Sequence, residues 1–208
     1  MPISVILVTV LVCYFLGNHN GAICVSHMLH DDVRDHGSGN AGLTNFIRNY
    51  GNSRALLVIA IDVLKAVLAC WLGGILCAPY GYALEGKVLA GVAVMVGHDF
   101  PALLGFRGGK GILCGFTVAL MLDWRVALIL LGIFAMAFVS TRYVSLSSIL
   151  AAAGFCVAFC VFHWDRPLVA AGGVFLGVLA IVMHKANIVR LLNGTENKFS
   201  IRKKEKNG

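Results

Sequence analysis

Residues 55–78 read ALLVIAIDVLKAVLACWLGGILCA, an apolar stretch of 24 residues that contains only two charged side chains. A simple membrane-spanning helix needs roughly 20 consecutive apolar residues, so this stretch is long enough to cross a bilayer. The two charges, Asp62 and Lys65, lie three residues apart and therefore share one helix face. Because charges inside a span are costly unless they are paired, we expect them to form a buried structural pair.

The composition extends this expectation to the whole chain. It has 208 residues, of which 59% are hydrophobic and 13% charged, and its mean hydropathy is +0.84. A soluble globular domain carries about 25% charged residues, so the sequence predicts an all-α integral membrane protein. The apolar segments are 3–25, 55–78, 86–97, 112–122, 125–139, 146–163 and 168–183.

About seven transmembrane helices follow from these segments. The third, fourth and fifth are short for a simple span, so we expect them to extend into polar flanks or to be shielded by protein. The expected organisation is one multi-span domain over residues 1–196, followed by a basic tail over residues 197–208.

The distribution of Lys and Arg predicts the orientation. With the N-terminus outside, three of the 17 basic residues face outward and Lys65 lies within a helix. The other 13 face the cytoplasm: Arg34, Arg48, Arg54, Arg107, Lys110, Arg142, Lys185, Arg190, Lys198, Arg202, Lys203, Lys204 and Lys206. The glycine-rich and polar segments then all lie on the cytoplasmic face, where we expect the chemistry.

Charge and cysteine content exclude several other classes. The net charge of +7 comes largely from the C-terminal tail, which suits contact with anionic lipid better than binding to nucleic acid. The seven cysteines all fall in apolar segments, and no His/Cys spacing resembles a metal site. We expect no nucleic-acid partner, no metal and no cofactor.

The first polar segment, residues 36–51, reads HGSGNAGLTNFIRNYG. Its glycines allow backbone N–H groups to converge on an anion, and Thr44 is a candidate N-cap for a helix that carries Arg48. Arg48 could add a bidentate contact to a phosphate group. The alternative is a flexible loop between helices. The candidate phosphate-binding residues here are Ser38, Gly39, Asn40, Gly42, Thr44 and Asn45.

The second polar segment, residues 97–112, reads GHDFPALLGFRGGKGI and adds Arg107 and Lys110 to a glycine-rich loop. It resembles a phosphate cradle but not a Walker A loop, because Lys110 is followed by Gly111 instead of Ser or Thr. His98 is a candidate general base, with an unperturbed pKa of roughly 6.5. The alternative for His98 is an interfacial hydrogen-bonding role.

Two further segments complete the set. STRYVSLSSILAA, residues 140–152, offers Arg142 and Ser145 as phosphate ligands or, alternatively, as an interfacial anchor and a helix cap. HKANIVRLLNGTE, residues 184–196, is typical of an amphipathic helix on the membrane surface. His184 and Asn187 are three residues apart in it and share a face.

Together these segments resemble the bacterial acyl-phosphate-dependent glycerol-3-phosphate acyltransferase family, PlsY. The matching stretches are DVRDHGSGNAGLTNFIRNYG (32–51), GHDFPALLGFRGGKG (97–111), TRYVSLSS (141–148) and HKANIVRLLNGTE (184–196), with the Asp-x-x-Lys of residues 62–65 between them. The resemblance covers nearly the whole chain, in order.

The resemblance implies a seven-helix enzyme of the bacterial plasma membrane. Such an enzyme moves an acyl chain from acyl-phosphate to the sn-1 hydroxyl of glycerol-3-phosphate, giving lysophosphatidic acid and phosphate. It implies that Ser38 and Arg48 are essential and that His184 and Asn187 support activity. Glu196 is implied to serve structural integrity. The implied phosphate-handling residues are Gly108, Gly109, Lys110 and Gly111.

We expect the acyl group to pass directly from the donor to the glycerol hydroxyl, because acyl-phosphate is already activated and needs no covalent serine intermediate. The hydroxyl proton would pass to His98, to His184 or to a substrate phosphate. Cationic and N–H donors would stabilise the leaving phosphate, and the acyl chain would lie between helices, open to membrane lipid.

The chain departs from the family pattern at Ala41, Ala186, Ser147 and residues 17–23. A different acyltransferase class uses a His-x-x-x-x-Asp pair, and that spacing occurs at His27/Asp32 and His30/Asp35. The companion proline-glycine-glycine-arginine motif of that class is missing. The remaining alternative is a multi-span transporter or a non-catalytic lipid-binding relative.

Overall fold

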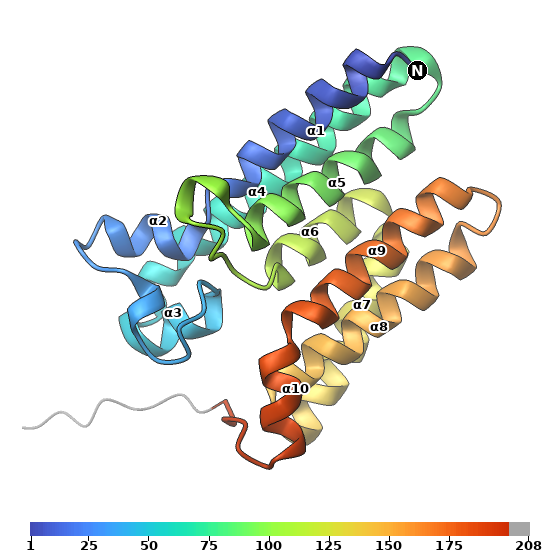
Figure 1. Ribbon diagram of the computed structural model, residues 1–208. Helices are drawn as coiled ribbons and strands as arrows, with labels where there is room; N and C mark the ends of the chain where they lie inside the picture. The colour runs from blue at the N-terminus through green and yellow to red at the C-terminus, as the bar shows by residue number, and fades with distance from the viewer. Residues whose placement is uncertain (200–208) are drawn as a thin grey trace, which may run out of the picture.

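The computed structural model describes residues 1–199, which form helices and connecting loops with no strand among them (Figure 1). The long helices are α1 (Ile3–Asn18), α4 (Asn52–Cys77), α5 (Ala83–Asp99), α6 (Ile112–Leu122), α7 (Trp124–Thr141), α8 (Val144–Phe162) and α9 (Pro167–Met183). The short helices are α2 (Gly21–His27), α3 (Leu43–Tyr50) and α10 (Lys185–Leu192), with 3₁₀ turns η1 (Val33–Asp35), η2 (Ala78–Tyr80) and η3 (Ala102–Leu104).

All seven apolar segments appear as helices, which confirms the predicted all-α membrane architecture. Within the described residues, α4, α5, α7 and α8 are each long and apolar enough to cross a membrane. Two bent pairs, α1 with α2 and α9 with α10, raise the number to six if each pair counts as one span. The remaining apolar helix, α6, is only 11 residues long.

The three segments that are short for a span, 86–97, 112–122 and 125–139, have different explanations: two extend into their flanks and one is shielded by protein. Helices α5 and α7 extend into their flanks and reach 17 and 18 residues. Helix α6 does not extend, and it buries Cys114, Val118 and Leu122 in the same core as residues of α4, α5 and α7. Its length therefore reflects shielding by neighbouring helices.

The first apolar segment is not the continuous helix expected over residues 3–25. Helix α1 ends at Asn18, and α2 begins at Gly21 after a bend of 45°. The side chain of Asn20 caps α2 by accepting from Ile23 N at 3.1 Å, and it donates to the Ala41 carbonyl at 3.0 Å. Polar residues within the stretch 17–23 thus break the helix and attach it to the first polar loop.

Glycines allow two helix pairs of the bundle to approach closely. A Cβ at Gly17 of α1 would lie 2.3 Å from Val94 O of α5, and one at Gly73 of α4 would lie 2.3 Å from Gly86 O of α5. Small residues permit such close packing in membranes, where no hydrophobic force drives helices together. Helices α1 and α4 are therefore fixed tightly against α5.

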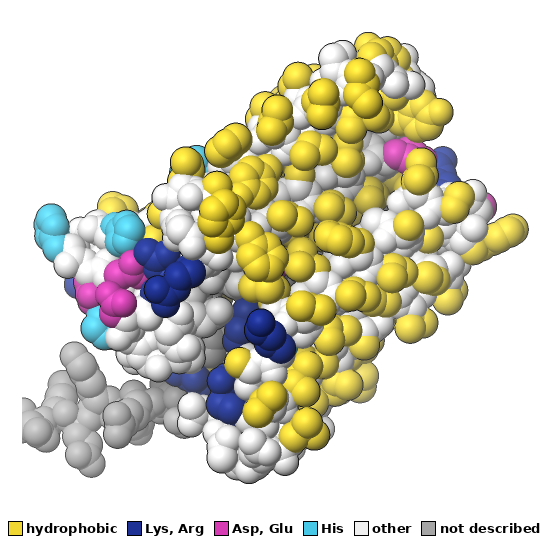
Figure 2. Space-filling view, viewed as in Figure 1, with side chains coloured by type: hydrophobic (Ala, Val, Ile, Leu, Met, Phe, Trp, Pro, Cys, Tyr) yellow, Lys and Arg dark blue, Asp and Glu magenta, His cyan; other side chains and the backbone are white. Residues whose placement is uncertain are grey.

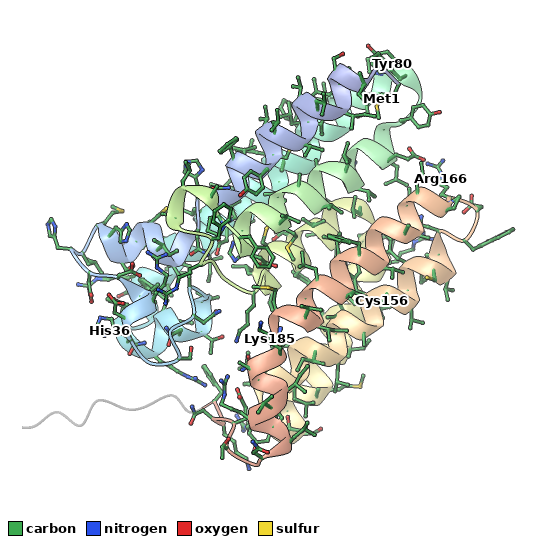
Figure 3. The ribbon with its side chains drawn as sticks, in the orientation of Figure 1. Met1, His36, Tyr80, Cys156, Arg166 and Lys185 are labelled. Carbon is green, nitrogen blue, oxygen red and sulfur yellow. The ribbon has the colours of Figure 1, made fainter. Side chains whose placement is uncertain are left out.

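The two ends of the bundle differ in character. Met1, Tyr80 and Arg166 lie at one end, whereas His36 and Lys185 lie toward the other (Figure 3). The second end carries α2, α3, α10 and the loop before α6 (Figure 1). Hydrophobic side chains cover the shaft of the bundle, and Lys and Arg gather beside this second end (Figure 2). Of the expected basic tail, residues 200–208 lie outside the described part of the chain.

Candidate active site

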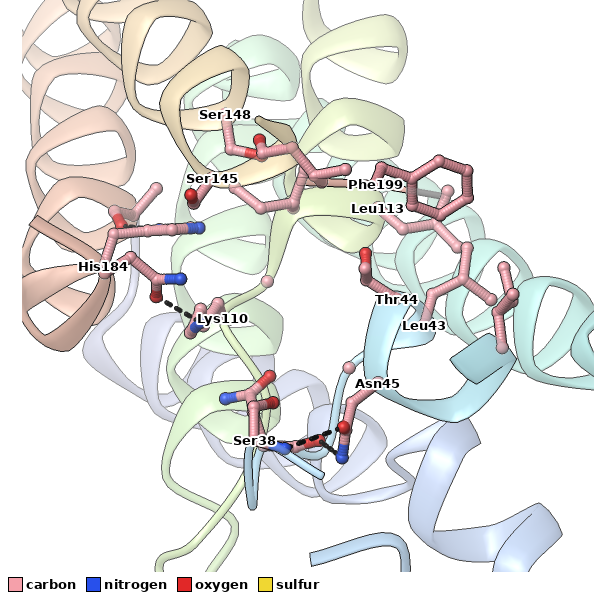
Figure 4. A pocket seen from close by; sticks show the side chains of 18 of the residues that line it. Ser38, Leu43, Thr44, Asn45, Lys110, Leu113, Ser145, Ser148, His184 and Phe199 are labelled. Atoms are coloured by element: carbon pink, nitrogen blue, oxygen red, sulfur yellow. Dashed lines mark hydrogen bonds between the residues drawn. The ribbon is translucent and has the colours of Figure 1, made fainter. Parts of the chain in front are cut away.

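A cavity of about 1500 Å³ opens at the loop end of the bundle and contains residues of all four polar segments (Figure 4). The sequence-predicted residues that line it are Ser38, Asn40, Gly42, Thr44, Asn45, Arg48, Asp62, His98, Lys110, Gly111, Ser145, His184, Asn187 and Glu196. Segments more than 140 residues apart in the chain therefore meet at one site.

The first loop is organised around the buried side chain of Asn45. Its amide donates to the carbonyls of Val33, His36 and Asn40 at 3.0–3.1 Å, and its Oδ1 accepts from Ser38 N at 3.0 Å (Figure 4). Asn45 thus holds the loop in the conformation that presents Ser38 to the cavity. Its predicted contact with phosphate stays a prediction.

Helix α3 begins two residues before the position that the sequence suggested. Its N-cap is Gly42, so Thr44 lies in the first turn, and the prediction of Thr44 as N-cap is wrong. Gly42, Leu43 and Thr44 all line the cavity. The N-terminal turn of the helix, with its free N–H groups, therefore borders the cavity, and Arg48 follows on the same helix.

The glycine loop before α6 is held against the end of α5 by its backbone. Gly108 N donates to Asp99 O and Gly109 N to His98 O, both at 3.2 Å. A Cβ at Gly108 would lie 2.0 Å from His98 O, so no larger residue fits there. Gly108 and Gly109 do not line the cavity, and they place Lys110 and Gly111, which do.

Lys110 begins a chain of polar contacts that reaches the C-terminal segment. Its Nζ donates to Asn187 Oδ1 at 2.5 Å, and Asn187 Nδ2 donates to Glu196 Oε1 at 2.9 Å (Figure 4). Glu196 also accepts from Ser145 Oγ at 2.9 Å and from Arg190 Nε at 2.7 Å. The Glu196 carboxylate thus joins α8, α10 and the lysine loop.

The surroundings of Lys110 favour its neutral form. Burial, together with the nearby positive charges of Arg190 and Arg48, lowers the pKa of Lys110 to about 8, against the opposing effect of Glu196. The Glu196 pKa is itself lowered, because its donors outweigh the cost of its burial. The cavity mouth is a concentration of positive charge that a bound anion would relieve.

One ring nitrogen of His184 is engaged in a hydrogen bond with the backbone. Its Nδ1 lies 2.7 Å from the carbonyl oxygen of Ala180, which can only accept a hydrogen bond. Nδ1 therefore carries the proton, and the neutral ring presents Nε2 as an acceptor. The side chain is buried and lines the cavity beside Lys110 (Figure 4).

His98, Asp62 and Lys65 form a buried cluster at the inner wall of the cavity. Lys65 Nζ lies 2.8 Å from Asp62 Oδ1 and 2.7 Å from His98 Nδ1, and it donates to the carbonyls of His19 and Gly17. Lys65 does not line the cavity itself, whereas Asp62 and His98 do. The pair within α4 therefore connects the α1–α2 break to His98.

Besides Gly108 and Gly109, three predicted phosphate ligands do not line the cavity: Gly39, Arg107 and Arg142. Arg142 and Arg107 are exposed. Arg142 adopts a left-handed backbone (φ 63°) at the end of α7. Its carbonyl accepts from Phe199 N at 2.8 Å. Arg142 thus ends α7 and holds the segment after α10 in place.

Sequence reasoning missed part of the cavity. Arg190, three residues after Asn187, lines it, and the spacing from Asn187 was an available signal. The apolar part had no local signal, because its residues come from four helices. These residues include Phe116, Leu130, Phe134, Ala152, Phe155, Leu176 and Ala180.

The alternative His-x-x-x-x-Asp pairs lie elsewhere. His27, His30 and Asp32 line a separate, shallow hollow that shares no residue with the large cavity. Asp32 is bound by Arg34 at 2.7 Å, which leaves His27 with a longer contact of 3.4 Å. This geometry does not support a catalytic pair.

Comparisons with known proteins agree with the architecture. A family model described as glycerol-3-phosphate acyltransferase matches residues 7–194. The chain is 39% identical over 192 residues to a glycerol-3-phosphate acyltransferase of Thermoanaerobacter sp., covering 92% of this chain and 94% of that protein. It is 35% identical to one of Finegoldia magna, with 91% and 93% covered.

Two solved structures are similar to the fold. The crystal structure of PlsY, an integral membrane glycerol 3-phosphate acyltransferase, in its glycerol 3-phosphate form superposes with a TM-score of 0.82. That protein is 31% identical, and 94% of this chain and 96% of the other are covered. Its lysophosphatidic acid form gives a TM-score of 0.80 at 30% identity.

Proposed function

Because this chain belongs to the glycerol-3-phosphate acyltransferase family, we propose that it acylates the sn-1 hydroxyl of glycerol-3-phosphate with acyl-phosphate as the donor. The products are lysophosphatidic acid and inorganic phosphate. The observation that carries the proposal is the continuity of the cavity, whose polar mouth leads into an apolar groove. An acyl-phosphate has the same division into an anionic head and an apolar chain.

The polar mouth supplies the groups that two phosphorylated substrates need. Arg48, Lys110 and Arg190 line it, together with the N-terminal turn of α3. Cations and free N–H groups at a helix start both favour phosphate oxygens. Ser38 lies on the loop that precedes α3 and lines the same mouth. Its hydroxyl can hydrogen-bond the phosphate or the carbonyl of the donor.

The apolar groove accepts the acyl chain. Along α8 it runs from Ser145 at the mouth through Ala152 to Phe155, which is about 15 Å at the rise of an α-helix. Phe134 of α7 and Leu176 of α9 form parts of its walls. The groove therefore lies along the direction of the membrane-spanning helices, as a lipid tail does.

The reaction is a direct acyl transfer. The sn-1 hydroxyl oxygen attacks the carbonyl carbon of the donor, and an ester bond forms. The bond between that carbon and the phosphate oxygen then breaks, and inorganic phosphate leaves. The hydroxyl proton passes to His184 Nε2, the acceptor nitrogen of that ring, or to a substrate phosphate. Lys110 and Arg48 stabilise the leaving phosphate.

The active site faces the cytoplasm of a bacterial plasma membrane in this proposal. The basic residues that favour an inside location, such as Arg48, Arg54, Lys110 and Lys185, lie at the cavity end of the bundle. Glycerol-3-phosphate is soluble and reaches the mouth from that side, whereas the donor enters from the lipid.

The experiment is acyl transfer by the detergent-purified protein with glycerol-3-phosphate and one donor per assay: palmitoyl-phosphate, palmitoyl-CoA or palmitoyl-carrier protein. We expect lysophosphatidic acid from the acyl-phosphate alone. Ser38→Ala and Arg48→Ala should each lower kcat/KM by about 100-fold or more, because each removes a donor to the transition state.

The matched controls are Ser53→Ala and Arg166→Ala, which change exposed residues outside the cavity and should leave activity unchanged. Product from a thioester alone would keep the acyltransferase and replace the donor. No product from any donor in a folded sample would contradict the proposal and favour a transporter or a non-catalytic lipid-binding protein.

A further inference from the structure

We propose that His98 donates a hydrogen bond from Nε2 to a phosphoryl oxygen in the cavity, and that Lys65 sets this donor role by fixing the tautomer of the ring. The inference rests on the proposed function for the identity of the anion. It assigns His98 to stabilisation of phosphate, and so removes it from the candidate general bases.

The first step is the contact between Lys65 and His98. Lys65 Nζ lies 2.7 Å from His98 Nδ1. An ammonium group can only donate, and the other partners of Nζ are acceptors: Asp62 Oδ1 at 2.8 Å, His19 O at 2.9 Å and Gly17 O at 3.3 Å. Nδ1 therefore accepts from Lys65, and the proton of the neutral ring is on Nε2.

The second step concerns Asp62, which could otherwise take a proton from Nδ1. Its Oδ1 lies 3.5 Å from Nδ1, longer than the 2.8 Å to Lys65. The same oxygen accepts from Gly21 N at 3.1 Å. Asp62 is thus satisfied by Lys65 and by the start of α2, and the shorter contact of Nδ1 is the one with the lysine.

The third step is the direction of Nε2. A Cβ placed on Gly109 would lie 2.3 Å from this nitrogen, so the ring edge points at the glycine loop beside Lys110. The His98 residue is 4% exposed and lines the cavity. Within residues 1–199 no hydrogen bond to Nε2 occurs.

A donor at this wall of the cavity favours a hydrogen-bond acceptor opposite it, because a donor that loses water without gaining an acceptor is costly. The cavity on that side is bordered by Lys110, Gly111 and the N-terminal turn of α3, all of which favour an anion. A phosphoryl oxygen satisfies Nε2–H and these groups together. His98 and His184 then act in opposite senses, since His184 presents a free acceptor to the same cavity.

The direct test is the tautomer of His98 in the intact protein. Two-bond ¹H–¹⁵N spectra of histidine-labelled protein in detergent distinguish the Nε2–H form, the Nδ1–H form and the cation, and His98→Gln assigns the signal. We expect neutral Nε2–H across the neutral pH range. Lys65→Met should convert His98 to a mixture of the two neutral forms.

The same spectra test the ligand. Glycerol-3-phosphate and inorganic phosphate, added separately, should each shift the Nε2 signal of His98, while the signals of the exposed His30 should not move. An Nδ1–H or cationic His98, or a His98 signal unaffected by either anion, would overturn the proposal. These spectra need no turnover, so they separate this inference from failure of the proposed reaction.

Activity supplies the second arm. His98→Gln keeps an N–H group near the position of Nε2, and His98→Leu removes it. We expect His98→Leu to lose about 100-fold in kcat and His98→Gln to keep at least a tenth of wild-type kcat. His30→Asn is the control that leaves kcat unchanged. Equal loss in the Gln and Leu variants would contradict a donor role.

Discussion

The lysine of the glycine loop carries a charge that depends on pH within the working range of an enzyme. Lys110 has a pKa lowered from 10.5 to about 8, mainly by burial. The charged form, which we propose binds phosphate, is complete well below pH 8 and is lost as the pH rises through that value. We therefore expect kcat/KM for glycerol-3-phosphate to fall above about pH 8.

Lys110→Arg tests the cause, because arginine stays protonated throughout this range. The fall above pH 8 should disappear in this variant, whatever its absolute activity. Lys185→Arg is the matched control, since Lys185 is an exposed lysine of α10 outside the cavity. The same decline in Lys110→Arg as in the wild type would assign the pH dependence to another group.

Asn45 allows a stability prediction at the same scale. Asn45→Ala removes the two amide hydrogens that are shared among three carbonyls, and the two hydrogen bonds that Oδ1 accepts from Ser38 N and Asn49 Nδ2. At about 1 kcal/mol net for each bond, the loop should lose several kcal/mol of stability. We expect a lower Tm and faster proteolysis within residues 28–42, while Asn52→Ala, which changes an exposed amide, leaves both unchanged.

Single residues also show where sequence reasoning ends. The types of Lys110, His184 and Asn187 and their spacing were enough to select them, and the structure brings them to one cavity. The tautomer of His98 depends on Lys65, which is 33 residues away in the chain. Arg142 had the right charge, but the end of α7 places it outside the cavity.

Between elements, the groove that α6, α7, α8 and α9 line together should limit the acyl chain. Ala152 is buried and lines the groove, so Ala152→Phe fills it about two turns beyond Ser145. We expect KM for a palmitoyl donor to rise about tenfold or more, with little change for a short-chain donor. Assays of kcat/KM over a series of acyl-phosphates measure this.

The neighbouring Ala153→Phe is the matched control, because Ala153 is exposed and does not line the groove. It adds the same ring to the same helix on the lipid-facing side. If both variants shifted the chain-length profile alike, the effect would come from the helix as a whole, and the groove would not be the acyl site.

Element boundaries were predictable where apolar length alone decides them, as in α4 and α8. The bends were not, because they depend on tertiary contacts. The break after Asn18 is held by Asn20 bonding to Ala41, and the 55° bend between α9 and α10 coincides with His184 at their junction. Hydropathy records neither contact.

At the scale of the whole molecule, the charge distribution predicts the N-terminus outside and the cavity end in the cytoplasm. Single cysteines test this in a cysteine-free background. Arg166→Cys should react with a membrane-impermeant thiol reagent in intact cells. Lys185→Cys should react only after the membrane is permeabilised, because it lies toward the cavity end of the bundle.

The reverse pattern of labelling would invert the orientation, and labelling of both positions in intact cells would show leaky membranes. The necessary control is that the cysteine-free protein is not labelled, because the chain has seven native cysteines, of which Cys160 is exposed. The sequence alone could predict this orientation because it depends on charge counts and on no tertiary contact.

The continuity between the polar mouth and the apolar groove also affects how the reaction rate scales with substrate. A donor that enters from the lipid is sampled in two dimensions, by its mole fraction in the surface, and not by its amount per volume of solution. Extra detergent at constant total donor would lower the mole fraction of donor in that surface and slow the reaction. The concentration of the dissolved acceptor would be unaffected. With the proposed donor, the enzyme would respond to the crowding of that donor within the bilayer.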